Sequence, residues 1–450
     1  MKRHESSSQK RDPILVIVSL FVKQIPMKKK IAFISEHASP LATLGGVDSG
    51  GQNVYVAELA KHLASAGYQI DIFTRREDQN QPYIAHWLPG IRVIHIEAGP
   101  AICIAKEELL QYMPQFTKNM SSFIRTEQIN YEVIHANFWM SGLVACDLKE
   151  ILHIPFVITF HALGYVRKLY QKDVDKFPAC RIDVEKHVAA NADVIIAECP
   201  QDREDLINYY GANAQKITII PCGFSKKEFY PVDKAEARKK LGLDPDADII
   251  LQLGRMVPRK GIDNVIRAAA KLKDNNKPLK LLVVGGDTDI PDPEKSPELK
   301  RLMDIARKED ILSSVCFTGR KNRAELKYYY SAADIFITTP WYEPFGITPL
   351  ESMACGTPVI GSDVGGIKYS VAHGETGFLV QPDNPLALAD KIDLLLNDKQ
   401  LLLSMQRNSI ERVNKQFTWA RVASMAAALY EQLVAAVPHP AVRHRQQTAA

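Results

Sequence analysis

The sequence predicts an α/β protein in which two doubly wound parallel sheets face each other across a cleft. Short apolar runs typical of buried strands recur along the chain, and amphipathic stretches typical of helices separate most of them. This alternation favours parallel sheets with helices on both faces, a Rossmann-like arrangement. It restarts after a cluster of Pro221, Gly223 and Pro231, which indicates a boundary between two such units.

The first unit is predicted to span residues 27–224. Its first strand leads through a glycine-rich loop into a helix of residues 53–66, which ends at Gly67. The predicted strands are residues 30–35, 68–74, 93–96, 133–136, 156–160, 194–197 and 217–221. Because parallel sheets bind ligands beyond the carboxyl ends of their strands, the loops after these strands are the candidate ligand-binding segments.

The second unit is predicted to span residues 225–412. It opens with a helix of residues 235–241, and its predicted strands are residues 248–254, 279–285, 315–318, 335–339, 358–362 and 377–380. The next segment, residues 413–436, contains a long helix that is expected to return toward the first unit. The last residues, 437–450, form a polar tail that is expected to be disordered.

Composition narrows the class of protein. Of the 450 residues, 46% are hydrophobic and 24% are charged, as in soluble globular proteins. The net charge of +4 is small for this length and disfavours a nucleic-acid-binding protein, which concentrates Lys and Arg on one face. The seven cysteines include no Cys-x-x-Cys pair, so neither a zinc site nor a disulfide framework is indicated. Reduced thiols in a cytoplasmic protein are the simplest interpretation.

Residues 1–26 are interpreted as a leader or an extended start. The apolar run of residues 14–22 follows Lys10 and Arg11, as in a weak signal peptide, but no small-x-small cleavage site follows it. The run is too short to span a bilayer, which leaves loose membrane association as the alternative. Met27 is a candidate for the functional start.

Two carboxylates, Glu343 and Glu351, bracket a segment with the features of a ligand-binding loop. Pro344 disfavours helix at Glu343, Pro349 suits the first turn of a helix, and Gly356 ends that helix. Free amides at such a helix start attract anions, and carboxylates bond hydroxyls. The combination fits a nucleotide-sugar.

The same segment allows a purely structural interpretation. Residues 348–351 also match a capping box, in which Glu351 bonds the backbone of Thr348. The sequence around these residues leaves both interpretations open.

Two loops follow predicted strands and precede predicted helices, as phosphate-binding loops do. Residues 45–52 contain four glycines but match neither Gly-x-Gly-x-x-Gly nor a P-loop, which disfavours a redox dinucleotide or a simple NTPase. Residues 254–261 carry three cations, of which Arg255 and Lys260 are suited to hold a diphosphate. A flexible loop and a solvated basic turn are the respective alternatives.

His161 ends a predicted strand, where a cleft-facing histidine can bond a sugar hydroxyl. A satisfied structural histidine is the alternative. Asp287 and Asp289 form an Asp-x-Asp pattern of the kind that binds a metal in other sugar transferases. The pattern occurs four times in the chain, so it specifies little, and no catalytic metal is expected.

Together these motifs resemble the retaining glycosyltransferases of family 4, which have the GT-B architecture of two facing Rossmann-like domains. The resemblance covers about residues 28–436. It rests on the glycine loop at 45–52, Phe-Thr-Arg at 73–75, His161, Gly254-Arg255 with Lys260, the segment from Glu343 to Glu351, and Gly365-Gly366. Within that family the chain resembles sucrose-phosphate synthases and enzymes that glycosylate inositol phosphate.

The resemblance implies a donor site without cofactor or metal, in which the nucleotide-diphosphate sugar is a co-substrate. Glu351 would bond the ribose, and Glu343 would contact the donor sugar beside the amides of residues 345–347. Arg255 and Lys260 would hold the diphosphate. The implied donor-binding residues are Gly50, Gly51, Arg255, Lys260, Gly319, Arg320, Glu343, Phe345, Gly346, Ile347 and Glu351. Of these, Gly319 and Arg320 would meet the nucleobase, and His161 would join Glu343, Arg255 and Lys260 as catalytic residues.

The implied acceptor site contains Gln52, Lys106, Phe138, His161 and Arg181. Lys106 and Arg181 match residues that grip an acceptor phosphate in both subgroups. Phe138 and Ala162, however, stand where inositol-phosphate enzymes use hydroxyl side chains. The acceptor is therefore a sugar phosphate or a related phosphorylated molecule, or else a neutral sugar, a lipid-linked sugar or a small aglycone.

The resulting hypothesis is a cytoplasmic, metal-independent retaining glycosyltransferase. It would move a hexose from a nucleotide-diphosphate sugar, with a UDP-sugar favoured, to a small hydroxylated acceptor. The alternatives are a nucleotide-sugar epimerase of the same architecture, a reversible phosphorylase, and a nucleotide-sugar-binding scaffold without turnover. Neither nucleic acid nor membrane is expected as a partner.

Overall fold

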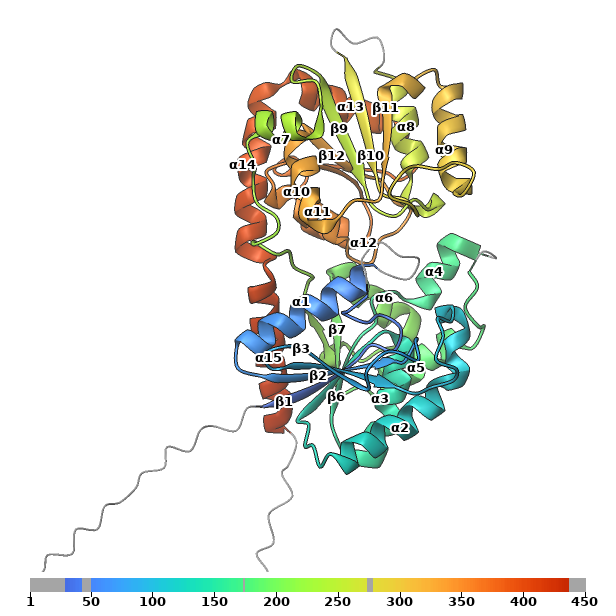
Figure 1. Ribbon diagram of the computed structural model, residues 1–450. Coiled ribbons are helices and arrows are strands. Elements are labelled where there is room, and N and C mark those ends of the chain that lie inside the picture. Colours follow the sequence, from blue (N-terminus) through green and yellow to red (C-terminus); the bar gives the residue numbers. More distant parts are fainter. Residues whose placement is uncertain (1–28, 43–49, 173–174, 273–277, 437–450) are drawn as a thin grey trace, which may run out of the picture.

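The computed structural model describes residues 29–42, 50–172, 175–272 and 278–436. The expectations for the leader, the polar tail and most of the glycine loop at 45–52 lie outside these residues. Figure 1 shows two domains, one above the other, with the C-terminal half of the chain forming the upper one. Both contain a sheet between layers of helices, so the predicted fold class is confirmed.

The N-terminal domain contains an eight-stranded sheet in the order β3-β4-β2-β1-β5-β6-β7-β8. Neighbouring strands run parallel except β3 and β4, which form an antiparallel pair at the edge. The strands are β1 (Lys30–Ile34), β2 (Gln69–Arg75), β3 (Ile84–Leu88), β4 (Ile91–Ile96), β5 (Val133–Asn137), β6 (Phe156–Thr159), β7 (Val194–Ala197) and β8 (Ile217–Ile219). Sequence analysis predicted all of them except β3.

Helices cover both faces of this sheet, which explains why its central strands are apolar throughout. In β1, Ile31 and Phe33 pack in one core with α1 and α15 (Trp419–Ala436), whereas Ala32 and Ile34 pack in a second core with α2 and α3. Apart from α15, the α-helices of this domain are α1 (Gly51–Ser65), α2 (Met113–Thr126), α3 (Trp139–Leu152), α4 (Gly164–Gln171), α5 (Arg181–Asn191) and α6 (Pro200–Tyr210).

The C-terminal domain contains a six-stranded parallel sheet in the order β11-β10-β9-β12-β13-β14. Its strands are β9 (Asp248–Leu253), β10 (Leu279–Val284), β11 (Val315–Gly319), β12 (Ile335–Thr338), β13 (Val359–Ser362) and β14 (Gly377–Val380). Its helices are α7 (Lys234–Leu241), α8 (Ile262–Ala270), α9 (Pro297–Lys308), α10 (Arg323–Ala332), α11 (Ile347–Ala354), α12 (Gly365–Ser370), α13 (Pro385–Asn397) and α14 (Lys399–Gln416). All six predicted strands of this unit are confirmed.

The chain crosses between the domains twice, at neighbouring points. It leaves the first sheet after β8, and it returns where α14 meets α15, which packs against α1 (Figure 1). The backbone amide of Phe224 donates to the carbonyl of Phe417 over 2.8 Å. A side chain on Gly223 would place Cβ 2.7 Å from the backbone nitrogen of Trp419, so this crossing requires glycine.

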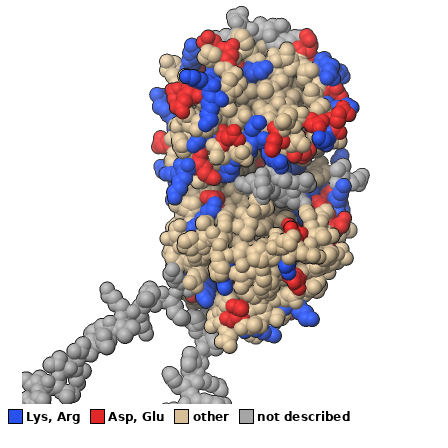
Figure 2. Space-filling view, viewed as in Figure 1, with Lys and Arg blue, Asp and Glu red and all other residues tan. Residues whose placement is uncertain are grey.

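Figure 2 shows charged side chains of both signs intermixed over the C-terminal domain, whereas the N-terminal domain is largely uncharged on this face. On this face the mixed signs form no broad basic surface of the kind that attracts nucleic acid. Among the described helices, none is both long enough and apolar enough to cross a membrane.

Candidate active site

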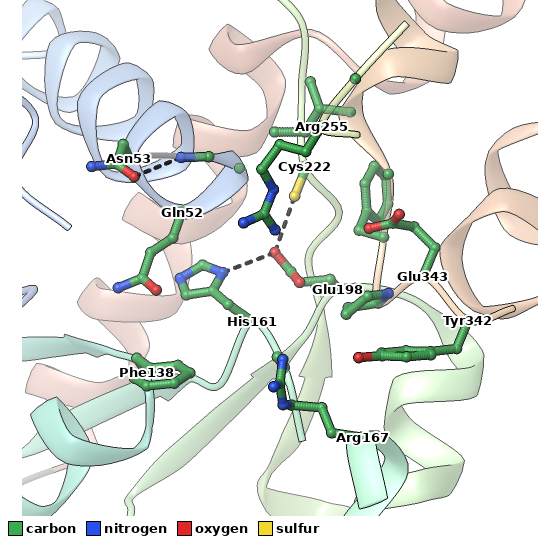
Figure 3. A pocket seen from close by; sticks show the side chains of 18 of the residues that line it. Gln52, Asn53, Phe138, His161, Arg167, Glu198, Cys222, Arg255, Tyr342 and Glu343 are labelled. Atoms are coloured by element: carbon green, nitrogen blue, oxygen red, sulfur yellow. Dashed lines mark hydrogen bonds and ion pairs between the residues drawn. The ribbon is translucent and has the colours of Figure 1, made fainter. Parts of the chain in front are cut away.

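A cavity of about 330 Å³ lies between the two domains (Figure 3). Residues that follow β1, β5, β6 and β7 line it from the N-terminal domain, and residues that follow β9 and β12 line it from the C-terminal domain. The predicted site residues that line it are Gly50, Gly51, Gln52, Lys106, Phe138, His161, Arg255, Lys260, Glu343, Phe345, Gly346 and Ile347. The structure thus brings together most of the predicted donor and acceptor residues.

Glu343 lies in the loop between β12 and α11, where its carboxylate bonds the ammonium of Lys260. Arg259 approaches the same carboxylate oxygen at 3.8 Å. Burial favours a raised pKa for Glu343, but the charges of Lys260 and Arg259 outweigh burial and lower the pKa. Burial also lowers the pKa of Lys260, an effect that Glu343 partly offsets. The cavity therefore contains a fixed carboxylate beside fixed cations.

Two glycines at the start of α12 hold the loop that carries Glu343. The amide of Gly366 donates to the carbonyls of Glu343 and Pro344, at 3.2 and 3.1 Å. A Cβ on Gly365 would overlap the carbonyl oxygen of Glu343, and one on Gly366 would overlap the backbone of Phe345. Only glycine allows this close packing, which explains why the motif contains Gly365-Gly366.

The helix after Glu343 has Pro349 in its first turn, as predicted. Gly346 adopts φ +87° at the N-cap and α11 starts at Ile347, so Pro349 is the third helical residue. Gly346, Ile347 and Thr348 all line the cavity. Unpaired amides of a helix start favour negatively charged ligands, so this end of α11 is suited to a phosphate.

The structure contradicts the capping-box interpretation of Glu351, because Gly346 and not Thr348 is the N-cap of α11. Because α11 starts at Ile347, Glu351 lies more than a turn inside it and is 2% exposed. Its carboxylate accepts bonds from Arg323 at 2.8 Å and from the Tyr330 hydroxyl at 3.1 Å. It is not a capping residue of Thr348, and it is not among the residues that line the cavity. Its contact with a ribose stays a prediction.

His161 lines the cavity, and Figure 3 shows its ring bonded to Glu198. Its Nδ1 lies 3.2 Å from Glu198 Oε1, and its Nε2 lies 3.1 Å from Asn137 Oδ1. The ring of Tyr55 packs edge-on against it, with 4.7 Å between centroids. Both ring nitrogens thus bond protein groups, and neither is left to bond a sugar hydroxyl in this arrangement.

Sequence analysis missed Glu198, which lines the cavity and is 4% exposed. It is the first residue after β7, just as His161 follows β6 closely. A polar residue directly after a buried strand was the available signal. The same criterion points to His37, which follows β1, lines the cavity and bonds the buried Glu36 carboxylate through Nδ1 at 2.8 Å.

The part of the cavity wall that the N-terminal domain provides combines cations with aromatic rings. Lys106 and Arg167 line it together with Phe138 and Phe177. The amide of Gln52 donates to Ser35 Oγ and to the carbonyl of Asn137, both over 3.2 Å, so this side chain is held in place. Arg167 lies over the Phe177 ring, 5.0 Å from its centroid.

Arg181, predicted to bind the acceptor phosphate, lies behind this wall and is 2% exposed. Its Nε bonds Glu185 at 2.8 Å, and its Nη2 donates to the carbonyl of Ala162 over 2.6 Å. Its guanidinium packs on Phe177 at 4.3 Å from the ring centroid. Arg181 therefore supports the wall, and Arg167 is the arginine of α4 that faces the cavity.

Gly319 and Arg320, predicted near the nucleobase, also lie outside the cavity wall. Gly319 is the last residue of β11 and Arg320 follows it, at the carboxyl edge of the second sheet. Gly319 adopts φ +73° and accepts a bond from the amide of Gly285 over 3.0 Å, and Arg320 pairs with Asp289 at 2.9 Å. The described residues contain no group of three His, Cys, Asp or Glu side chains that could hold a metal.

Two Rossmann-like domains that share a cavity lined by carboxylate, cations and a free helix start define the GT-B fold of glycosyltransferases. Comparison with known proteins agrees: residues 49–227 match the model for Glycosyltransferase Family 4, and residues 233–412 match that for Glycosyl transferases group 1. The chain belongs to glycosyltransferase family 4.

Relatives cover nearly the whole chain. D-inositol 3-phosphate glycosyltransferase of Corynebacterium glutamicum (strain R) is 35% identical over 413 residues, which cover 90% of this chain and 97% of that one. The structure of sucrose-phosphate synthase from Thermosynechococcus elongatus is similar with a TM-score of 0.83 and 36% identity, over 91% of this chain and 100% of that one. HepE from Anabaena, solved with UDP and glucose, covers 90% of this chain and 100% of that one and shares the fold at 20% identity, with a TM-score of 0.69.

Proposed function

We propose that the protein transfers a hexose from a UDP-sugar to a small phosphorylated acceptor, such as a sugar phosphate or an inositol phosphate, with retention of configuration and without a metal. The observation that carries this proposal is the cavity itself. It is lined by Glu343, Arg255 and Lys260 of one domain and by Lys106 and Arg167 of the other. Two separate groups of cations suit two anionic substrates bound side by side.

The donor is assigned to the C-terminal domain. Arg255, Arg259 and Lys260 would bind the diphosphate and stabilise the charge that develops on it as the bond to the sugar breaks. The amides at the start of α11 would support the same group, and Glu343 would accept bonds from sugar hydroxyls. HepE, a protein of the same fold, is solved with UDP-glucose, which supports a uridine nucleotide.

The acceptor is assigned to the N-terminal domain. Lys106 and Arg167 would hold its phosphate, and Gln52 and His37 would meet its hydroxyls. The names of two relatives support a phosphorylated acceptor, since one acts on inositol 3-phosphate and the other makes sucrose phosphate. The transfer would form the new bond on the face from which the diphosphate leaves, with no protein nucleophile.

The aromatic walls favour a second candidate acceptor. Phe138 and Phe177 offer flat apolar surfaces at the acceptor side, and apolar faces of sugars or aglycones pack well on such rings. A neutral sugar or small aglycone would use these walls and would leave Lys106 and Arg167 without a substrate anion.

A mass-spectrometric screen tests both candidates. UDP-, GDP- and ADP-hexoses are each combined with sugar phosphates, inositol phosphates and the same acceptors after dephosphorylation. The proposal expects a product mass only with a UDP-hexose and a phosphorylated acceptor. Products from dephosphorylated acceptors alone would replace it by the second candidate. Epimerised donor, which has the same mass as the substrate and is separated from it by chromatography, would replace the proposal by an epimerase if no transfer product formed.

A further inference from the structure

His161 is held from both sides by oxygen atoms whose identity is fixed by their surroundings. On one side, Asn137 Nδ2 donates to the carbonyls of His135 and Ile34, at 3.2 and 3.4 Å, so the amide presents Oδ1 to His161. The opposite orientation would direct Oδ1 at those two carbonyl oxygens. On the other side stands the Glu198 carboxylate, which is an acceptor when ionised.

Two acceptors require two donors. A neutral imidazole has one N–H group, so its other nitrogen would direct a lone pair at the lone pairs of the second oxygen. An imidazolium has two N–H groups and donates to both oxygens. The geometry therefore favours the doubly protonated ring. The adjacent His135 differs, because burial and then the charge of His161 lower its pKa to about 3, and it remains neutral between Tyr430 and Thr159.

Glu198 is itself held in position. The thiol of Cys222 donates to Glu198 Oε1 over 3.0 Å (Figure 3). The backbone amide of Glu198 donates to Asp202 over 2.9 Å. Burial and then the charge of Glu198 raise the pKa of Cys222, so the thiol keeps the proton that it donates. The carboxylate is thus fixed before any substrate binds.

The backbone at His161 is strained. Its φ is +59°, and the amide of Ala162 donates to the carbonyl of Phe160 over 2.7 Å, which makes His161 the centre of a γ-turn with positive φ. This turn is rare for residues other than glycine and persists where the surroundings determine it. The two ring contacts supply that constraint at the point where the chain enters the cavity.

We propose that Glu198 is a positioning residue for glycosyl transfer, which keeps the His161 ring doubly protonated and, together with Asn137, holds the strained turn in place at the cavity. This inference rests on the proposed function for its catalytic consequence only. Glu198 acts through His161, because its carboxylate oxygen is shared between the imidazole and the Cys222 thiol.

The test uses the full chain with Glu198→Gln, and with Glu204→Gln as a matched control. Glu204 lies on α6 close to Glu198 in sequence, but its side chain is exposed. Glutamine keeps the size of the side chain and removes its charge. The groups that face His161 from the surrounding elements are Tyr55, Asn137, His135, Glu198, Cys222 and Arg255, and they are unchanged in the control.

Long-range ¹H–¹⁵N spectra of the imidazole report the number of ring protons, and His161→Gln assigns the signal. The expected result is two ring protons at pH 7 in the wild type and in Glu204→Gln, and one in Glu198→Gln. A ring with one proton in the wild type, or two in Glu198→Gln, would overturn the charge assignment. This readout needs no substrate, so it remains decisive even where the proposed donor and acceptor are wrong.

Kinetics test the positioning role. We expect kcat of Glu198→Gln to fall about 100-fold while the donor KM changes little, because misplacement of a site group by about 1 Å has effects of this size. Full kcat in Glu198→Gln with a melting curve like that of the control would overturn the role.

Discussion

Lys260 and Glu343 contact each other directly, although the proposed reaction gives them different parts of the donor. Each charge compensates the other in a buried place, which keeps both ionised before the donor arrives. A bound diphosphate would attract Lys260, and the sugar hydroxyls would take its place at Glu343. The pair thus preserves two charged groups that burial alone would disfavour.

Lys260→Ala is expected to lower kcat by about 100- to 1,000-fold, because it removes a donor aimed at the developing charge of the leaving group. Arg259 remains 3.8 Å from Glu343, so the carboxylate keeps a cationic neighbour and the fold should persist. Steady-state kinetics with a UDP-hexose measure the loss, and circular dichroism checks the fold. Lys271→Ala, an exposed lysine after α8, is the control. Near-normal activity of Lys260→Ala would remove this residue from the site.

The surroundings of Glu351 in the structure differ from those that its sequence motif suggests. The sequence pattern makes Glu351 a ligand-binding residue, but α11 buries its carboxylate against Arg323 and Tyr330. Removal of the charge leaves Arg323 with only Glu228, at 3.0 Å, as a carboxylate partner. Breaking a buried pair from one side is costly because the remaining charge stays buried.

Glu351→Gln should therefore reduce the free energy of unfolding by about 3 kcal/mol. Urea unfolding followed by circular dichroism measures the change, and Glu411→Gln, an exposed carboxylate on α14, serves as the control. A variant as stable as the control but inactive would instead return Glu351 to the ligand-binding role that the motif suggests.

Sequence analysis could locate residues that follow strands, because the carboxyl ends of parallel strands share one edge. That reasoning placed His161 and Arg255 correctly at the cavity. It could not separate Arg167 from Arg181, because the difference arises from the side-chain packing of Phe177 between α4 and α5. Glu198 carried the same signal as His161 and was available from the sequence.

At the scale of elements, α4 of the N-terminal domain contacts the loop that carries Glu343. Tyr170 stacks on Tyr342 with 5.2 Å between ring centroids and 22° between planes. Gln171 bonds the Tyr342 hydroxyl, and Arg259 lies over the same ring at 5.3 Å. Tyr342 therefore contacts residues of both domains and connects the two walls of the cavity.

Tyr342→Ala should raise the ratio of donor hydrolysis to transfer, because it loosens the walls that exclude water. Stacked aromatic pairs contribute about 0.5–1.5 kcal/mol, so the increase should be about tenfold or less. Tyr342→Phe keeps the stack, loses only the hydroxyl, and should stay close to the wild type. Free hexose and transfer product are counted together by chromatography. An unchanged ratio in Tyr342→Ala would show that α4 has no part in excluding water.

The elements missed by sequence analysis have local causes. β3 and β4 form a hairpin closed by Pro89 and Gly90, with Gly90 at φ +81°, and this Pro-Gly signal was available. β3 lies at the edge of the sheet, and its residues are all partly or fully exposed. It therefore lacks the apolar run that marks the central strands. The start of α11 depends on φ +87° at Gly346, which the backbone packing of Gly365 and Gly366 determines.

At the scale of the whole molecule, one apolar core continues from the first sheet across the domain crossing into the second. Phe224, Phe417 and Trp419 belong to it at the crossing, and Phe345 joins it from the cavity wall. The rings of Phe345 and Phe417 lie 6.3 Å apart. The domain crossing and the donor loop are thus packed together, and a change in the angle between the domains would move Phe345.

Global stability should also depend on Asp202, which bonds the amide of Glu198 beside the cavity. Burial and then the charge of Glu198 raise its pKa from 3.8 to about 8. Between these values the folded protein keeps a proton that the unfolded chain has released. Stability from this group is therefore complete below pH 3.8 and is lost as pH rises toward 8.

Asp202→Asn removes this titration and keeps an oxygen that can accept the amide bond of Glu198. The difference in unfolding free energy between variant and wild type should therefore grow in favour of the variant from pH 5 to pH 8. Urea unfolding at several pH values measures it, and Asp390→Asn, an exposed aspartate on α13, should show no such trend. Burial also lowers the pKa values of His95 and His135. These histidines titrate in both proteins, so their effect cancels from the difference in unfolding free energy. A difference independent of pH would mean that Asp202 is already ionised in the folded protein at pH 5.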